Sequence, residues 1–189
     1  MLSPTLSKAT KLDDTTTLVK QTQNGDRRAF SELVRRYQTT VYRSCYRILG
    51  DKEDAKDASQ ETFLRAYNKL DTFRGRSTFK IWLLRVAMNV SLNERSSRGR
   101  KVPHNNIDLA QFVASTEAPE AELMRAEAAA QMHDALELVR PDHRAAIVLR
   151  ELEGLTYQET AEALGVSEGT AKSWVHRGRK QMKRLLIAA

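Results

Sequence analysis

Residues 155–186 read LTYQETAEALGVSEGTAKSWVHRGRKQMKRLL, and they carry the most specific local pattern of the chain. Thr156 and Glu159 form a T-x-x-E capping box that opens a helix. Gly165 suits the left-handed position of a tight turn, and Ser167 can cap a second helix. Two helices joined by so short a turn predict a helix-turn-helix.

The second of these helices combines an apolar face with a basic one. Small or apolar residues with a 4-3-4-3 spacing are predicted to face inward, namely Ala171, Val175, Gly178, Met182 and Leu185. Residues 169–189 contain six Lys or Arg and no Asp or Glu. Such a helix suits the major groove of duplex DNA, where phosphates supply affinity and side chains reach base edges. The alternative is a solvated basic face on an ordinary helical hairpin, but capping box, turn glycine, second cap and segregated charge occur together and favour DNA binding.

The composition of the whole chain agrees with a globular protein that binds a polyanion. The 189 residues carry a net charge of +7, with 41% hydrophobic and 29% charged residues, so the partner is nucleic acid or an anionic membrane face. Only eight Gly and four Pro are present, and no run alternates apolar and polar residues, so an all-α fold is predicted.

Several site classes are excluded by residue counts. The one cysteine, Cys45, can build neither a disulfide framework nor a Cys-cluster zinc site, and we expect it to pack in the core. The four histidines show no ligand spacing, so no metal and no cofactor is expected. No apolar run approaches the ~18 residues of a membrane helix, and the N-terminus lacks the apolar core of a signal peptide. We therefore expect no membrane insertion and a cytoplasmic location.

Periodicity divides the chain into two helical blocks. We expect a disordered leader over 1–14, a first domain over 15–98, a flexible linker over 99–122 and a second domain over 123–189, which ends in the helix-turn-helix. In the first block, Gly50-Asp51 should end a long amphipathic helix, and Ser77 could cap the third helix. The predicted fold is thus all-α, with two small helical domains joined by the linker.

The first block contains an acidic and a basic segment. Its second helix starts with Asp51, Glu53, Asp54, Asp57 and Glu61, which serve either helix-dipole electrostatics or protein docking. Residues 74–101 hold eight Lys or Arg against one acid, with Phe73, Phe79 and Trp82 nearby. Aromatic rings beside a cationic track suit single-stranded DNA, although spacing alone favours Phe79 and Trp82 as core residues.

Three segments together resemble one protein family. They are DAKDASQETFLRAY (54–67), FRGRSTFKIWLLRVAMNVSLNERSSR (73–98) and LRELEGLTYQETAEALGVSEGTAKSWVHRGRKQMKRLL (149–186). They resemble the second and fourth conserved regions of extracytoplasmic-function sigma factors, over roughly 15–98 and 125–186. The departures are Val139-Arg140-Pro141, where the family often has Leu-Pro, and Trp174 and His176 in the last helix. They leave the promoter sequence open.

The resemblance implies a role for individual residues. Docking on the coiled coil of the largest subunit of RNA polymerase falls on Asp54, Asp57, Gln60, Glu61 and Arg65. The resemblance implies that the loop 69–77 captures a flipped base of the −10 element and that the helix after it holds the melted strand. The residues implied in these two roles are Phe73, Arg74, Arg76, Trp82, Arg85, Asn89 and Asn93. Contact with the −35 element falls on Thr170, Lys172, Ser173, His176 and Arg177, with Arg179 and Lys180 on phosphates.

The resemblance also implies partners and excludes a reaction. The partners are core RNA polymerase, promoter DNA and an anti-sigma factor, which usually holds family members inactive. One rival is a stand-alone regulator that binds duplex DNA without polymerase. A second is an enzyme acting on DNA, but Ser59, Ser77 and Ser91 have no histidine near them in sequence, so no catalytic residue is expected.

Overall fold

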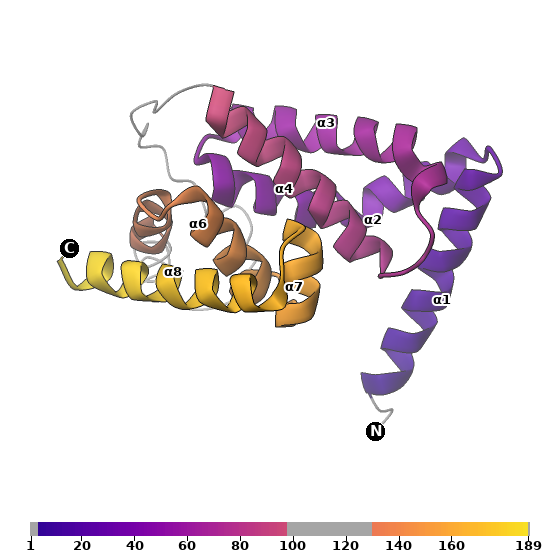
Figure 1. Cartoon of the computed structure of the whole chain (residues 1–189). Coiled ribbons are helices and arrows are strands. Elements are labelled where there is room, and N and C mark those ends of the chain that lie inside the picture. The colour runs from indigo at the N-terminus through magenta and orange to yellow at the C-terminus, as the bar shows by residue number, and fades with distance from the viewer. Residues whose placement is uncertain (1–3, 98–129, 189) are drawn as a thin grey trace, which may run out of the picture.

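The structure, a computed structural model, describes residues 4–97 and 130–188 (Figure 1). All regular structure in these two ranges is helical, which confirms the predicted fold class. The elements are α1 (Pro4–Gln23), α2 (Arg27–Leu49), α3 (Lys52–Lys69), the 3₁₀ turn η1 (Leu70–Thr72), α4 (Phe79–Ser97), α6 (Pro141–Ile147), the π-helical turn η3 (Val148–Leu152), α7 (Tyr157–Leu164) and α8 (Glu168–Ala188). A further helical segment covers 130–137. The predicted linker over 99–122 lies outside the described residues.

The ends of α2 and α3 follow from local capping chemistry. The carboxylate of Asp26 accepts hydrogen bonds from the backbone N–H groups of Arg28 at 2.8 Å and Ala29 at 3.3 Å, so α2 begins there. It ends at Gly50, whose φ of 81° is the left-handed conformation that glycine adopts without strain. Asp51 then caps α3 by accepting from the N–H of Asp54 at 2.9 Å. The predicted break at Gly50-Asp51 is confirmed.

Two helix starts differ from the sequence-based expectation. Thr78, and not Ser77, caps α4, because its hydroxyl accepts a hydrogen bond from the N–H of Ile81 at 3.4 Å. The predicted cap was wrong by one residue, since both candidates carry a hydroxyl. Helix α1 begins at Pro4, so helix covers most of the leader 1–14 for which we expected no structure.

The first block encloses a hydrophobic core of its own between α1, α2, α3 and α4. Leu33, Val41 and Cys45 of α2 are fully buried there, as the amphipathic pattern predicts. Burial raises the pKa of the Cys45 thiol to about 11, against the opposing hydrogen bonds of Ser91 and Thr62. The packing role expected for the cysteine is confirmed.

A second hydrophobic core is shared between the two blocks. Ile48 of α2 and Ile81, Leu84 and Met88 of α4 are buried in one cluster with residues of the second block, namely Ala135, Leu136, Val139, Ala145, Ile147, Val148, Leu149, Leu155, Ala163 and Met182. Helix α7 accordingly lies against α4, between the first block and α8 (Figure 1). The two predicted domains are thus packed on each other, which the sequence did not predict.

Two arginines tie the backbones of the two blocks together. Arg144 of α6 is fully buried and donates to the carbonyl oxygens of Ile48 at 2.8 Å, Val139 at 3.3 Å and Glu137. Arg95 of α4 donates to the carbonyl oxygen of Ile48 at 2.7 Å and to that of Glu137 at 3.4 Å. Burial, and secondarily the charge of Arg95, lowers the pKa of Arg144 to about 9.

Among the helices of the described residues, none combines the length and the apolar character needed to cross a membrane.

Candidate functional site

Most of the residues predicted to bind polymerase lie along one groove. The carboxylates of Asp54, Asp57 and Glu61 on α3 line it, together with the guanidinium of Arg65. Arg65 is held by Glu61, with an N–O distance of 2.6 Å. The opposite wall is α4, which contributes Val90, Asn93, Glu94 and Ser97. The structure therefore gathers four of the five predicted residues at the junction of α3 and α4.

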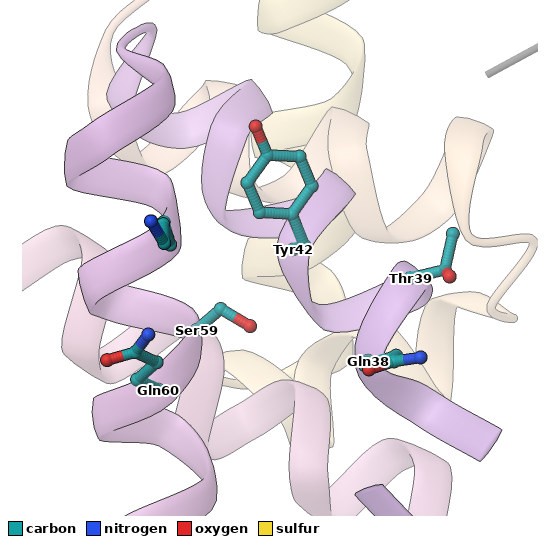
Figure 2. A pocket seen from close by; sticks show the side chains of 6 residues that line it. Gln38, Thr39, Tyr42, Ser59 and Gln60 are labelled. Carbon is teal, nitrogen blue, oxygen red and sulfur yellow. The ribbon is translucent and has the colours of Figure 1, made fainter. Parts of the chain in front are cut away.

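The fifth of these residues, Gln60, lies on the other side of α3. It lines a second groove, between α3 and α2, whose wall is formed by Gln38, Thr39, Tyr42, Lys56 and Ser59 (Figure 2). Helix α3 is therefore a ridge with a groove along each side. Sequence reasoning did not single out Tyr42, because it reads as one more apolar position of the amphipathic stripe of α2.

The loop before α4 is held in place by an aromatic cluster. The ring centroid of Phe73 lies 6.0 Å from that of Phe79 and 5.4 Å from that of Trp82. The side-chain amide of Gln23 donates to the carbonyl oxygens of Leu70 at 2.9 Å and Phe73 at 3.1 Å. Phe73 is only partly exposed, so it packs on the core more than its position in a loop suggested. Gln23 is a residue that the sequence analysis missed, because a lone polar residue at a helix end gives no periodic signal.

The residues predicted to hold a melted strand differ in exposure and in location. Arg74, Arg76, Arg85 and Asn89 are exposed, while Trp82 is partly buried against the first core. The exposed Asn93 lines the acidic groove beside α3 instead. The structure thus separates Asn93 from the aromatic cluster and places it among the residues predicted to bind polymerase.

The helix-turn-helix forms as the local pattern predicts. Thr156 and Glu159 make the reciprocal capping box of α7, and Gly165 ends that helix with a φ of 68°. The hydroxyl of Ser167 accepts from the N–H of Thr170 at 3.2 Å at the start of α8. The residues predicted to face inward are buried or partly buried, namely Ala171, Val175, Gly178, Met182 and Leu185.

The opposite face of α8 is polar and basic. Lys172, His176, Arg177, Arg179 and Lys180 are exposed on it, and Thr170 and Ser173 are partly exposed. Two of these cations have acidic partners in the structure. Lys172 lies 2.7 Å from a carboxylate oxygen of Glu168, and Arg179 lies 2.5 Å from one of Glu151.

These two acids also shift the pKa values of their cationic partners. The hydrogen bond that Lys172 donates to Glu168 raises the pKa of Lys172, and the one that Arg179 donates to Glu151 raises the pKa of Arg179. Both ion pairs are exposed and therefore contribute little to stability.

Two family models match the chain over its two blocks. "Sigma-70 region 2" matches residues 33–101 and "Sigma-70, region 4" matches residues 129–182. The RNA polymerase sigma-H factor of Pseudomonas aeruginosa is 36% identical over 177 residues, which cover 89% of this chain and 92% of that protein. The ECF RNA polymerase sigma factor SigW of Bacillus subtilis is 31% identical over 179 residues, which cover 89% of this chain and 94% of that protein.

Solved structures agree with these relatives. CnrH, in complex with the cytosolic domain of CnrY, superposes with a TM-score of 0.66 at 26% identity and covers 93% of this chain and 98% of its own. RpoE of Bartonella quintana, in complex with the anti-sigma factor NepR, has a TM-score of 0.68 at 24% identity. The match covers 83% of this chain and 96% of RpoE and shows that the two folds are alike.

Proposed function

Because the chain belongs to the extracytoplasmic-function sigma factors, we propose that its two blocks bridge core RNA polymerase and a promoter through the surfaces described above. The observation that carries the proposal is the segregation of charge. Four acids and one base, Arg65, line the groove between α3 and α4, and the acids are Asp54, Asp57, Glu61 and Glu94. The exposed face of α8 is basic. These two surfaces suit a protein partner and duplex DNA respectively.

The ridge of α3 is the proposed docking site for the coiled coil of the largest polymerase subunit. Asp54, Asp57 and Glu61 supply negative charge along one groove, and Gln60 lies in the groove on the other side. A ridge between two grooves fits a pair of helices, because each groove can receive side chains from one of them.

The aromatic cluster is the proposed site for the −10 element. The loop is fixed before DNA arrives by Gln23 and by the contacts of Phe73 with Phe79 and Trp82. A flipped base costs a few kcal/mol of stacking, so a preformed site reduces what binding must offset. Exposed Arg74, Arg76, Arg85 and Asn89 would follow the strand.

The exposed face of α8 is the proposed reader of the −35 element. Thr170, Lys172 and Ser173 lie near its N-terminal end, where side chains of a recognition helix reach base edges. His176 and Arg177 follow one turn later, and Arg179 and Lys180 are suited to phosphates.

A protein partner and a cytoplasmic setting complete the proposal. CnrH and RpoE were each solved with a second protein, described for RpoE as an anti-sigma factor, and we expect such an inhibitor for this chain. The chain should catalyse no reaction of its own. It should act in the cytoplasm, because polymerase and promoter DNA are there. A stand-alone DNA-binding regulator is disfavoured, because it would have no need of the matched region 2.

The test is reconstitution with purified core polymerase on promoter templates. The wild-type chain should yield promoter-specific transcripts and bind the core enzyme at low salt. Asp57→Asn should weaken core binding roughly tenfold, because a charge pair at an interface loses one partner. Asp134→Asn removes a charge from an exposed position of the second block and should leave core binding unchanged.

Two results would contradict the proposal. A chain that binds promoter duplex equally well with and without polymerase, and makes no specific transcript with it, is a stand-alone regulator. Core binding that is insensitive to Asp57→Asn and also to Gln60→Ala would remove the α3 ridge as the docking surface.

A further inference from the structure

A tyrosine in the first helix of the helix-turn-helix lies against two cations. Tyr157 is the first residue of α7 and is only partly exposed. The guanidinium of Arg150 lies 4.8 Å from the centre of its ring, and the ammonium group of Lys172 lies 5.7 Å from it. Both distances are within the limit of about 6 Å for a cation–π contact. One ring thus joins three elements, since Arg150 belongs to η3 and Lys172 to α8.

The ring of Tyr157 is supported by contacts that do not involve DNA. The capping box of Thr156 and Glu159 determines where α7 begins, and Tyr157 directly follows the cap. Arg150 donates to the carbonyl oxygen of Leu155 at 2.9 Å, and Leu155 is buried in the core. The ring therefore has a defined position before a ligand arrives.

Lys172 is the flexible partner in this contact. Its side chain is 56% exposed and lies near the N-terminal end of α8, where a recognition helix meets base edges. Its ammonium group has a second anchor, a carboxylate oxygen of Glu168 at 2.7 Å. A lysine has a flexible aliphatic stem, and ordering that stem on binding costs entropy. Because Tyr157 and Glu168 restrict the stem in the free chain, this cost on binding is lower.

Such a restraint suits contact with a base rather than with a phosphate. Phosphates line both edges of a groove, so an unrestrained lysine reaches one easily. A base edge offers its acceptor atoms at one place, and O6 and N7 of guanine are the commonest acceptors for lysine. The ammonium group must therefore be held near that place, and the two anchors of Lys172 hold it.

We propose that Tyr157 is a positioning residue for the −35 element, which directs the ammonium group of Lys172 to the acceptor atoms of one base pair. The inference rests on the proposed function, because it deepens the role of α8 as the reader of that element. The residues predicted from the sequence for this contact do not include Tyr157. The ring acts through Lys172, so its removal should lower discrimination at the base pair that Lys172 reads and at no other.

The test is a selection from promoter templates randomised over the −35 element. Holoenzymes are assembled from core polymerase and the full-length wild type, Tyr157→Leu, Tyr157→Phe or Lys172→Ala, and the transcribed templates are sequenced. The position at which Lys172→Ala loses its base preference identifies the base pair that Lys172 reads. At that position Tyr157→Leu should lower the preference roughly two- to fivefold, the size of a cation–π contact at an exposed site. Tyr157→Phe keeps the ring and should match the wild type throughout.

Two further variants separate positioning from a general effect on the fold. Gln158 is the exposed neighbour of Tyr157 on α7, so Gln158→Leu introduces the same side chain without removing a ring and should match the wild type. In a Lys172→Ala background, Tyr157→Leu should change no preference further, because the residue through which the ring acts is absent. A loss that is equal at all positions, or that persists in the double variant, would show a structural role only and overturn the inference.

Nuclear magnetic resonance of the free chain tests the contact itself. The ring current of Tyr157 should shift the ε-methylene protons of Lys172 upfield, and these resonances are assigned by their loss in Lys172→Ala. Tyr157→Leu should abolish the shift, and Tyr157→Phe should keep it. If Tyr157→Leu loses its helical circular dichroism, Tyr157→Met takes its place in both measurements with the same expected results. Unshifted protons in the wild type would show that the ring does not hold Lys172, and would overturn the inference.

The selection also separates this inference from the proposed function. If the wild type selects no −35 sequence, the proposed role of α8 is rejected, and the inference with it. If the wild type selects a sequence and Tyr157→Leu selects it equally strongly, the function stands and the inference is rejected. The inference is likewise rejected if Lys172→Ala relaxes no position. An equal loss in Tyr157→Phe and Tyr157→Leu would assign the effect to the hydroxyl group, which also rejects positioning by the ring.

Discussion

Arg144 is a single residue whose environment has a measurable consequence. It is fully buried, and its guanidinium satisfies carbonyl groups at the end of α2 and in the segment before α6. Arg144→Ala removes the donor to the carbonyl oxygen of Val139 and leaves those of Ile48 and Glu137 with Arg95 alone. It should lower the free energy of unfolding by about 3 kcal/mol. Urea denaturation checks this, with the exposed Arg140→Ala as a control that should change stability by about 0.5 kcal/mol or less. An unchanged urea midpoint for Arg144→Ala would show that other donors replace it.

The sequence could not predict this role of Arg144. Its neighbours Ala145 to Leu149 are all apolar, and an arginine next to them in sequence is expected on the solvent-facing side of the helix. One of its acceptors, the carbonyl of Ile48, lies 96 residues earlier in the chain. A contact at that separation leaves no local pattern. The exposed cations of α8 were predictable, because their spacing alone places them opposite Ala171 and Val175.

At the scale of helices, the crossing of α6 and α8 depends on Gly178. A Cβ atom there would lie 2.5 Å from Cδ1 of Ile147 and 3.2 Å from the carbonyl oxygen of His143. Alanine normally stabilises a helix interior relative to glycine by about 1 kcal/mol, but here α8 must move away from α6. Gly178→Ala should therefore lower stability by roughly 1–3 kcal/mol.

A matched control lies on the same helix. A Cβ at Gly169 would meet only the hydroxyl oxygen of Ser167, at 3.9 Å, so Gly169→Ala should keep or raise stability. Thermal unfolding of both variants checks the pair. Equal melting temperatures would mean that Ile147 rotates away at no cost.

Helix boundaries were predictable where capping chemistry determines them. Gly50, Thr156 and Gly165 end or begin helices through hydrogen bonds with residues a few positions away. The start of α4 was misplaced because Ser77 and Thr78 have the same capping group, and tertiary packing selects between them. Helix α1 was missed in its first part because its residues show no apolar period, and its C-terminal part is stabilised by packing of Val19 in the first core.

At the scale of the whole molecule, we expect the stability of the contact between the blocks to depend on pH. The imidazole of His133 stacks on the ring of Tyr46, with centroids 4.6 Å apart and planes 6° apart. Burial lowers the pKa of His133 below its ordinary value of 6.5, and the nearby charge of Arg144 adds to this, while Glu137 and Asp134 oppose it. The unfolded chain therefore binds this proton more readily than the folded chain.

Stability should consequently be complete above the ordinary histidine pKa and should decrease as the pH falls below it. We expect the melting temperature to drop between about pH 7 and pH 5.5, since the unfolded chain takes up protons there. His133→Phe keeps a stacked ring and removes the titrating group, so it should reduce this pH dependence. A profile that is identical in wild type and His133→Phe would assign the effect to other groups, such as His143, whose pKa burial also lowers.

The relation between the two blocks was the least predictable property. Ile48, Ile81, Leu84 and Met88 are apolar residues of the first block, and the pattern of their helices would be satisfied equally by a core within one domain. These residues complete the core of the second block because the surfaces of α2 and α4 meet residues far away in the sequence. Such a contact leaves no local pattern. The same holds for Glu153, whose carboxylate accepts hydrogen bonds from Ser44 and Arg47 of α2 although its sequence position, before a turn glycine, is that of an ordinary surface charge.

The buried thiol of Cys45 limits which stimuli this molecule can receive directly. Oxidants and electrophiles attack thiolates, and a fully buried thiol with a pKa of about 11 presents almost none near neutral pH. The chain has no second cysteine with which to form an internal bridge. A thiol-based response to peroxide or disulfide stress therefore has to begin at the cysteine of another protein and reach this molecule through binding.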